Sequence, residues 1–276
     1  ANKNYKELHK QTMKFNVKNI IITDLESSKK FKKLNKNKKI NIFNNFMNLN
    51  KVFKKKIDYT MCAITGLEGL HPTIEIIKFT NKIAIANKEA IICGWNLLQK
   101  ELSKYNAHFI PVDSEHFSIW YSLKNKNNNN IKELYLTASG GPFFNLPLNK
   151  FKKIKIQEAL SHPNWKMGKK ISIDSATMMN KIFEVIEAKN IFNIRYKNIH
   201  ILSHPASYVH AIINFNSGIL KLIAHQTSMD IPIFNTLYSN DEKKMKSGKI
   251  KINKLNNLQL KSLEENRYPA VKILKK

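Results

Sequence analysis

The sequence predicts a mixed α/β fold in which a parallel-sheet domain is followed by an α+β domain. In the first half of the chain, short apolar runs alternate with segments that carry apolar residues at helical spacing, which is the βαβ rhythm of a parallel sheet. After residue 198, strand-like segments follow one another closely, as they do in antiparallel sheets. With 276 residues, 42% of them hydrophobic, the chain can bury a sizeable core.

The strands of the first half are predicted from apolar runs bounded by polar residues. These runs are residues 19–23, 59–65, 83–86 and 107–112. The segments beside them have apolar residues three or four positions apart, and the predicted helices are residues 67–80, 88–104 and 114–123. Ser114 is a favourable N-cap residue, so we expect it to cap the last of these helices.

The second half is predicted to contain long loops and a second sheet. A strand at 134–137 leads into a glycine-containing turn at 139–142, whose backbone amides can face an anion. Residues 161–170 lack periodicity and hold a Trp and a Met between Pro163 and Gly168, which predicts a mobile lid. The other predicted elements are a loop at 124–130, a helix at 175–192 and strands at 198–203, 209–215 and 218–224.

Charge and cysteine usage narrow the class of protein. The net charge is +27, but the lysines are scattered and accompany abundant Asn and Ile, so we interpret the charge as a compositional bias rather than a nucleic-acid surface. Cys62 and Cys93 lie in apolar runs, which indicates a reducing compartment. We find no apolar stretch of about 18 residues and no secretory signal, and we therefore expect a cytoplasmic protein without a membrane partner.

The two ends of the chain resemble breaks within a longer sequence. The chain begins at Ala1 in a polar stretch, and residues 271–276 stop in a basic amphipathic pattern without a capping signal. We expect sequence to be missing at both ends.

Acidic residues gather near one predicted sheet edge. Asp113 and Glu115 follow the strand that ends at Val112, at the edge where open α/β sheets bind ligands. With one glutamate from the later helix, Glu184 or Glu187 one turn on, they offer the oxygen ligands that Mg²⁺ and Mn²⁺ prefer. The alternative from spacing alone is a capped helix with solvated acids.

A second group of residues offers donors of the kind that hold a phosphate. Ser139, Ser175, Asn180 and Lys181 supply hydroxyl, amide and ammonium groups. Each also has an ordinary interpretation, with Ser175 as an N-cap and Lys181 as a solvated helix residue. The joint presence of acids and donors favours a phosphorylated substrate held beside a metal ion.

Four further residues are ambiguous when taken alone. His162 can contact a substrate and His204 can support the site, although a lone histidine is more often a surface or core residue. Trp165 can close over a ligand or pin the lid to the core, and Lys88 can reach a substrate oxygen or lie on the surface.

Several long motifs together carry a family resemblance. They are residues 86–89, 111–116, 139–143, 162–168 and 174–181, followed by Glu184. On these motifs, which occur in order over nearly the whole chain, it resembles the 1-deoxy-D-xylulose 5-phosphate reductoisomerase family. The resemblance implies a homodimeric, NADPH-dependent enzyme of the methylerythritol phosphate route, which converts 1-deoxy-D-xylulose 5-phosphate to 2-C-methyl-D-erythritol 4-phosphate with a divalent metal ion.

The resemblance also implies the domains. Residues 1–112 would form a partial Rossmann-like dinucleotide-binding domain, incomplete because the glycine-rich turn of the family would precede Ala1. Residues 113–276 would form the α+β catalytic domain that binds metal and substrate, with its lid at 161–170 and without the C-terminal helical domain of the family.

Site residues are carried over by the same motifs. Asp113, Glu115 and Glu184 would bind Mg²⁺ or Mn²⁺, with Co²⁺ as a further candidate, and these three would act with Lys88 in catalysis. The implied substrate-binding residues are Lys88, Ser114, Glu115, Ser139, His162, Trp165, Ser175, Asn180, Lys181 and Glu184, and Met167 belongs to the lid. The implied NADPH contacts are Asn2, Lys3, Asn4, Asn87, Glu89 and Gly168.

The chain departs from the family pattern at a few positions. Ile182 stands where the family usually has Gly, Ala206 replaces a Gln, Leu67 and Glu68 interrupt a small-residue turn, and the turn at 224–227 is altered. A decayed, noncatalytic homologue that binds metal and phosphosugar is therefore the alternative function. A basic nucleic-acid-binding protein is a third hypothesis.

Overall fold

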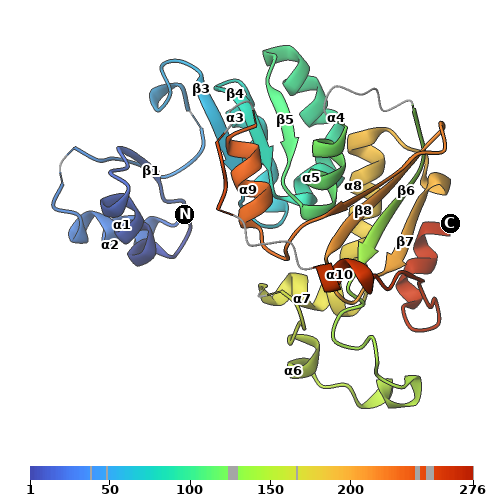
Figure 1. Ribbon diagram of the computed structural model, residues 1–276. Helices are drawn as coiled ribbons and strands as arrows, with labels where there is room; N and C mark the ends of the chain where they lie inside the picture. Colours follow the sequence, from blue (N-terminus) through green and yellow to red (C-terminus); the bar gives the residue numbers. More distant parts are fainter. Residues whose placement is uncertain are drawn as a thin grey trace.

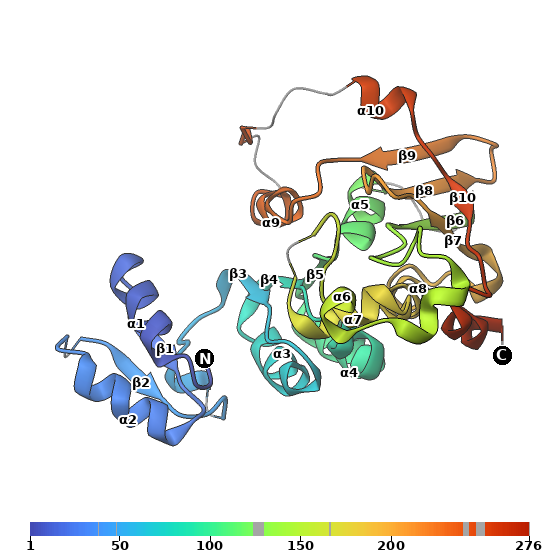
Figure 2. The ribbon, with the colours of Figure 1, turned by 90° about the horizontal axis from the view of Figure 1, so that it is seen from below.

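The computed structural model describes residues 1–37, 39–47, 49–123, 130–165, 167–239, 243–246 and 252–275. Apart from Asn130, the loop predicted at 124–130 lies outside these residues. The described chain forms a small N-terminal lobe, a parallel sheet with its helices, and a larger mixed sheet (Figures 1 and 2).

The N-terminal lobe contains two helices and two parallel strands. Its elements are α1 (Tyr5–Lys14), β1 (Asn19–Ile21), α2 (Leu25–Leu34) and β2 (Asn41–Phe43). Asp24 starts α2 by accepting a hydrogen bond from the Ser27 amide at 2.8 Å, which satisfies one of the free amides of the first turn. Ile20, Ile22 and Phe31 form the small core.

The second sheet is entirely parallel, as its sequence predicts. β3 (Ile57–Cys62), β4 (Thr80–Ile85) and β5 (His108–Pro111) are connected by α3 (Leu70–Ile77), preceded by the 3-10 turn Leu67–Gly69, and by α4 (Lys88–Tyr105). β3 and β4 begin two and three residues before the predicted apolar runs. The polar start of β4 is held by pairing with its neighbours, a tertiary effect that hydrophobicity does not reveal.

The third sheet has the strand order β10, β7, β6, β8, β9. The strands are β6 (Ile131–Ala138), β7 (Ile199–Ser203), β8 (Val209–Phe215), β9 (Leu220–Ala224) and β10 (Lys261–Ser262). The prediction of an antiparallel unit is wrong for β7, which pairs in parallel with β6. Two strands joined by a long helical crossover can lie in parallel, and α7 and α8 provide that crossover here.

Helices cover the mixed sheet and join it to the parallel one. They are α5 (Ser114–Ser122), α6 (Ile156–Ala159), α7 (Lys169–Ala176), α8 (Met179–Phe192), α9 (Asp230–Leu237) and α10 (Ile252–Asn256), with 3-10 segments at Leu49–Lys51, Leu148–Lys153, Tyr196–Asn198 and Pro269–Lys275. α8 contacts α4 on one side and β6 and β7 on the other. Leu134, Leu136 and Ile213 are completely buried in the core beneath it.

Two helix boundaries differ from the predictions. The helix predicted at 175–192 is two helices, because Met178 adopts the left-handed conformation with φ 66° and breaks the backbone ladder between α7 and α8. The N-cap residue of α5 is Asp113, and Ser114 is the first residue of the helix. The lid segment also ends earlier than expected, since α7 begins at Lys169.

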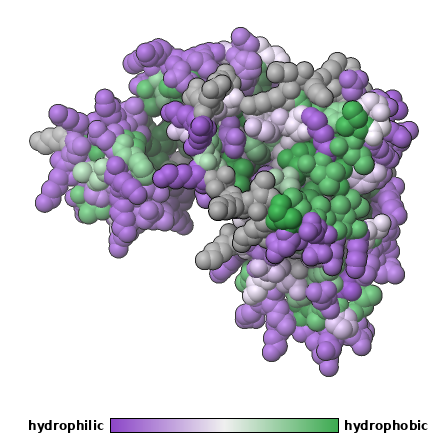
Figure 3. Space-filling view, in the orientation of Figure 1, coloured by the Kyte–Doolittle hydropathy of each residue, from purple (hydrophilic) through white to green (hydrophobic). Residues whose placement is uncertain are grey.

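The described residues give no sign of a membrane span, and hydrophilic side chains are widespread on one face of the molecule. Among the described residues, no helix combines the length and apolar character that crossing a bilayer requires. Hydrophilic residues are spread over every lobe of the face seen in Figure 3, which agrees with the scattered lysines of the sequence.

Candidate active site

A cavity of about 270 Å³ lies where the carboxyl ends of β4, β5 and β6 approach α8 and the lid. Every residue that the sequence predicted for metal or substrate binding lines it: Lys88, Asp113, Ser114, Glu115, Ser139, His162, Trp165, Ser175, Asn180, Lys181 and Glu184. Met167 of the lid lines it as well. The residues after β4 and β5 meet because the carboxyl ends of parallel strands share one edge, and α8 brings the residues of the mixed sheet to them by packing on α4, β6 and β7.

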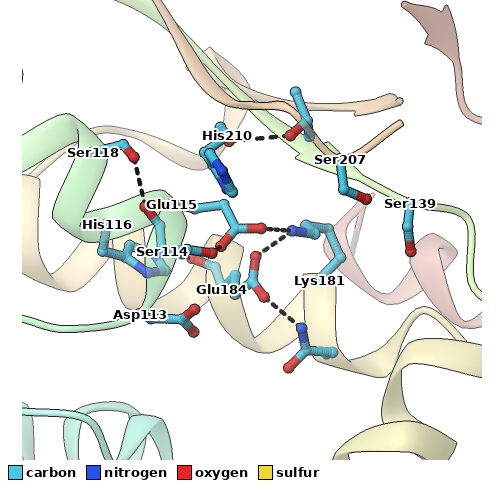
Figure 4. Close-up of polar contacts among 12 residues, drawn as sticks. Asp113, Ser114, Glu115, His116, Ser118, Ser139, Lys181, Glu184, Ser207 and His210 are labelled. Carbon is cyan, nitrogen blue, oxygen red and sulfur yellow. Dashed lines mark hydrogen bonds and ion pairs between the residues drawn. The ribbon is translucent and has the colours of Figure 1, made fainter. Parts of the chain in front are cut away.

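Carboxylates and ammonium groups lie next to one another in the cavity, and Figure 4 shows Lys181 bonded to both Glu115 and Glu184. The Lys88 ammonium lies 2.5 Å from Asp113 Oδ2 and 3.4 Å from Glu184 Oε1. The Lys181 ammonium lies 2.7 Å from Glu115 Oε1 and also pairs with Glu184. Each carboxylate therefore faces a cation, which is the condition for keeping charges in a buried site.

Neutral groups hold these charged side chains in place. Asn180 accepts a hydrogen bond from the Lys88 ammonium at 2.7 Å and donates one to Glu184 Oε1 at 2.5 Å. Ser114 donates to Glu115 Oε2 at 2.5 Å. The acids are thus buried and oriented, so the interpretation as solvated helix-capping acids is wrong for Glu115 and Glu184.

The cluster carries an excess of negative charge. Asp113, Glu115, Glu184 and the neighbouring Glu187 face only two ammonium groups, those of Lys88 and Lys181. Burial, reinforced by the charge of Glu115, raises the pKa of Glu184 to about 7. Burial also opposes the charge of Glu115, but Lys181 outweighs it and holds the pKa of Glu115 below its ordinary value.

A divalent cation fits this arrangement. One oxygen from each of Asp113, Glu115 and Glu184 lies within 4.8 Å of the other two. These three carboxylates share two ammonium groups, those of Lys88 and Lys181, so a further positive charge is favoured among them. Three carboxylates in a site of this kind are typical ligands of Mg²⁺ or Mn²⁺.

The structure distinguishes between the two candidate glutamates of α8. Glu184 lines the cavity, whereas Glu187 points to a completely buried histidine, with 3.4 Å between His116 Nδ1 and Glu187 Oε2. His116 Nε2 donates to the backbone oxygen of Glu184 at 2.9 Å and so supports the turn of α8 that presents the carboxylate. Sequence reasoning quoted His116 as part of a motif but assigned it no contact.

Hydroxyl groups line the cavity beyond Lys181. Ser139 Oγ accepts from the Gly141 amide at 3.1 Å and lies 3.0 Å from His162 Nε2. His162 Nδ1 accepts from the amides of Asn164 and Trp165, so Nε2 carries the proton of the neutral ring and donates it to Ser139. With its acceptor positions used, the Ser139 hydroxyl can direct its own proton to a ligand oxygen. The Gly141 amide, expected to face an anion, binds Ser139 instead.

The pocket residues that sequence reasoning missed include two with polar side chains, Ser207 and His210. Ser207, which has φ 50°, lies in the loop after β7, and His210 lies in β8. In Figure 4 Ser207 lies on the same side of Lys181 as Ser139, and His210 lies above Glu115. The only sequence signal for these two residues was the presence of a serine and a histidine near a strand end, which is weak evidence for a site. His204, the histidine that the sequence analysis chose from this region, hydrogen-bonds the Gln259 carbonyl and does not line the cavity.

The residues expected to contact a dinucleotide do not line the cavity. Asn2, Lys3 and Asn4 belong to the N-terminal lobe, where Asn4 caps α1. The Asn87 side chain is occupied by the carbonyls of Ile64 and Gly66 and by the Ala90 amide. Glu89 forms an ion pair at 2.7 Å with Lys170 of α7, two residues after Gly168, the N-cap residue of that helix.

Ile182 does not crowd the acids. Its side chain is 2% exposed and it is not among the residues that line the cavity. The larger side chain at this position therefore packs inside the protein and does not enter the cavity.

Family models match most of the chain. Residues 1–94 match the model described as 1-deoxy-D-xylulose 5-phosphate reductoisomerase, and residues 109–192 match the model of its C-terminal domain. The reductoisomerase of Pelagibacter ubique is 61% identical over 99% of the chain, which covers 71% of that protein. The chain belongs to the 1-deoxy-D-xylulose 5-phosphate reductoisomerase family.

Other reductoisomerases support the same membership. The enzyme of Wolbachia pipientis wMel is 43% identical over 79% of the chain, which spans only 56% of that relative. The structure of the Zymomonas mobilis reductoisomerase in complex with NADPH superposes with a TM-score of 0.88 at 30% identity, and the chain covers 71% of it. A reductoisomerase complex with NADPH, fosmidomycin and magnesium gives the same TM-score at 28% identity, with 70% covered.

Proposed function

We propose that this chain is the core of a 1-deoxy-D-xylulose 5-phosphate reductoisomerase, which uses NADPH and a divalent ion to form 2-C-methyl-D-erythritol 4-phosphate. The observation that carries the proposal is the single cavity in which an excess of buried carboxylates faces a group of serine, asparagine and lysine donors. One end of this cavity suits a cation and the other suits a phosphate. We infer the reaction itself from membership of the family.

At the metal end, Asp113, Glu115 and Glu184 would hold the ion. Mg²⁺ is the choice supported by the solved relatives, and Mn²⁺ or Co²⁺ would be accepted by the same oxygen ligands. When bound, the ion supplies Lewis-acid polarisation of the substrate carbonyl. Lys88 would donate to a substrate oxygen, because its ammonium already lies among Asp113, Asn180 and Glu184.

At the phosphate end, hydroxyl and amide donors would fix the substrate. Ser139, Ser175, Asn180 and Lys181 line this part, together with Ser207, and His162 directs the Ser139 hydroxyl proton as described above. Trp165 and Met167 would cover the ligand and exclude water. Holding a phosphate several atoms away from the reacting carbons positions those carbons for rearrangement and hydride transfer.

The cofactor would approach from the parallel sheet. Glu89 follows Lys88 in the first turn of α4 and pairs with Lys170 near the start of α7, where Gly168 is the N-cap residue, so a nicotinamide placed there would approach the substrate cavity. Asn87 would contribute through its backbone, since its side chain is already bonded. Asn2, Lys3 and Asn4 would contact the remote part of the dinucleotide from the N-terminal lobe. The domain division at residues 112 and 113 is part of this proposal.

We also propose a cytoplasmic homodimer. The two cysteines are free in the structure, which supports a reducing compartment. β9 is an edge strand with exposed apolar side chains, and it supports self-association through the mixed sheet.

The deciding experiment is NADPH oxidation with 1-deoxy-D-xylulose 5-phosphate and Mg²⁺ by the full-length gene product and its Glu184→Gln variant. We expect the variant to lose more than about a hundredfold in kcat/KM, because even the supporting partners of metal ligands contribute 10- to 100-fold. Glu26→Gln, at an exposed ion pair on α2, is the matched control and should behave as wild type. An active Glu184→Gln variant would contradict the assigned role of this carboxylate.

The same assay distinguishes the enzyme from the alternative, a noncatalytic homologue. A decayed homologue would bind Mn²⁺ and a phosphosugar, as measured by calorimetry, without oxidising NADPH. The 61% identity over the whole chain and the intact set of cavity residues favour the enzyme.

A further inference from the structure

Two histidines at the β8–β9 edge of the cavity form a stacked pair. The rings of His210 and His225 are nearly parallel, with an interplanar angle of 17° and centroids 3.6 Å apart. His210 is 3% exposed and lines the cavity, whereas His225 follows β9 and does not line it. His225 is therefore placed to act on the cavity only through His210.

Hydrogen bonds fix which ring nitrogen of each histidine carries the proton. His210 Nε2 lies 3.2 Å from the backbone oxygen of His225, and a carbonyl only accepts, so Nε2 is the donor. Burial lowers the pKa of His210 to about 4 and keeps the ring neutral, which leaves Nδ1 as its hydrogen-bond acceptor. By the same reasoning, His225 Nδ1 donates to the Gln226 carbonyl at 2.8 Å, which fixes the plane of the second ring.

His210 also contacts the lid. Trp165 meets the His210 ring edge to face, at 6.5 Å between centroids and 69° between planes. His210 therefore contacts both a lid residue and the His225 ring, which follows β9. A stack of this kind restricts rotation of the imidazole more than an aliphatic neighbour would.

We propose that His225 is a positioning residue that holds His210 as a neutral hydrogen-bond acceptor for a substrate hydroxyl. The backbone carbonyl of His225 selects the tautomer of His210, and its side chain lies flat on the ring and fixes its orientation. The inference rests on the proposed function, since it assigns His210 to a polyhydroxylated phosphosugar in the same cavity. Glu115 and Lys181, the charged groups that act on His210 from α5 and α8, stay paired to each other.

The test compares His225→Ala with His225→Phe in the full-length gene product. The Ala variant removes the stacked ring but keeps the carbonyl, and we expect KM for 1-deoxy-D-xylulose 5-phosphate to rise about threefold to tenfold, the usual worth of an aromatic pair, with kcat changed less. The Phe variant restores a flat ring and should return KM to within about twofold of wild type. His200→Ala is the matched control. His200 also packs on an aromatic ring, that of Tyr135 with 4.9 Å between the ring centroids, but it does not line the cavity.

A second measurement does not depend on turnover. In the ligand-free protein, the ¹⁵N shifts of His210 should report a protonated Nε2 and a bare Nδ1 in wild type and in both variants, because the backbone carbonyl of residue 225 is kept. The His210 ring signals should broaden in His225→Ala alone, where no stacked ring fixes its orientation. An unchanged KM and unchanged His210 line widths in the Ala variant would overturn the proposal. A Phe variant as impaired as the Ala variant would also overturn it. An inactive wild type with the expected shifts would instead reject the proposed function and leave the ring positioning standing.

Discussion

Lys181 and Lys88 determine the charge state of the cavity at the residue scale. Each ammonium is buried and faces two carboxylates, and Lys181 has its pKa raised above the usual range by Glu115 and Glu184 against the cost of burial. The carboxylates still outnumber the ammonium groups, so the Glu184 carboxylate is partly protonated near neutral pH when no ion is bound. Proton and metal therefore compete for one carboxylate.

This competition predicts a pH dependence of metal affinity. The folded-state pKa of Glu184, about 7, lies above its ordinary value of 4.5, so the metal-free protein retains a proton that the unfolded chain has lost between these pH values. Glu184 therefore contributes stability that is full below pH 4.5 and is lost as pH rises through 7. Binding of Mg²⁺ or Mn²⁺ should weaken as pH falls below 7, by up to about tenfold per pH unit for one displaced proton.

Calorimetric titration with Mn²⁺ in buffers of different ionisation enthalpy measures both the affinity and the released proton. We expect proton release at pH 6 and little release at pH 8. Equal affinities and no proton release across this range would show that Glu184 is already ionised in the metal-free protein.

At the element scale, the break between α7 and α8 shapes the phosphate end of the cavity. Met178 turns the chain through its left-handed conformation, so the last turn of α7 presents Ser175 while α8 presents Asn180 and Lys181. Gly141, with φ +64°, packs against the same turn of α7. A single continuous helix would not place these donors around one space.

Gly141→Ala tests this packing. A Cβ at this position would lie 2.9 Å from the Ser175 carbonyl oxygen, and backbone cannot move aside as a flexible side chain does. Because this clash adds to the strain of a left-handed φ, we expect the variant to lose about 2–4 kcal/mol in the free energy of unfolding, measured in urea. We also expect it to bind substrate more weakly. Gly218→Ala is the control, since its φ is +81° but nothing lies within 4 Å of the new Cβ. Its loss should be about 1 kcal/mol, and equal losses at both sites would contradict the packing explanation.

At the scale of the whole molecule, α8 packs between the two larger sheets, and the mixed sheet has an edge strand with exposed apolar side chains. β9 is that edge, and Ile219, Leu220 and Leu222 beside or within it are 61%, 57% and 48% exposed. Unpaired strand edges with apolar side chains favour pairing with another chain. The exposure here is the physical basis of the proposed dimer.

Leu220→Asp combined with Leu222→Lys should convert the dimer to a monomer, because charged side chains at a buried edge lose their solvation without gaining partners. Light scattering coupled to size-exclusion chromatography gives the mass directly. Leu25→Lys, at a leucine 66% exposed on α2, is the control and should leave the mass unchanged. A wild-type chain that is monomeric at micromolar concentration would contradict the dimer, and so would a double variant that remains dimeric.

The sequence by itself determined the kinds of groups at the site and the alternation of elements. The lysine after β4 and the carboxylates after β5 follow from local order, because the carboxyl ends of these parallel strands share one edge. The donors after β6 and the acid of α8 were indicated by their motifs. The motifs also identified the family, which the comparisons confirm.

Only the tertiary structure decided which residues meet. Lys88 reaches Asn180 across 92 positions of the chain. Spacing alone left Glu184 and Glu187 open, and the packing of α8 on α4, β6 and β7 turns Glu184, the residue that the family motifs indicate, into the cavity. The parallel pairing of β7, the left-handed Met178 and the stacked ring on His210 depend on contacts between distant segments. Local propensity carries no information about such contacts, since their free energy is gained only when the elements pack.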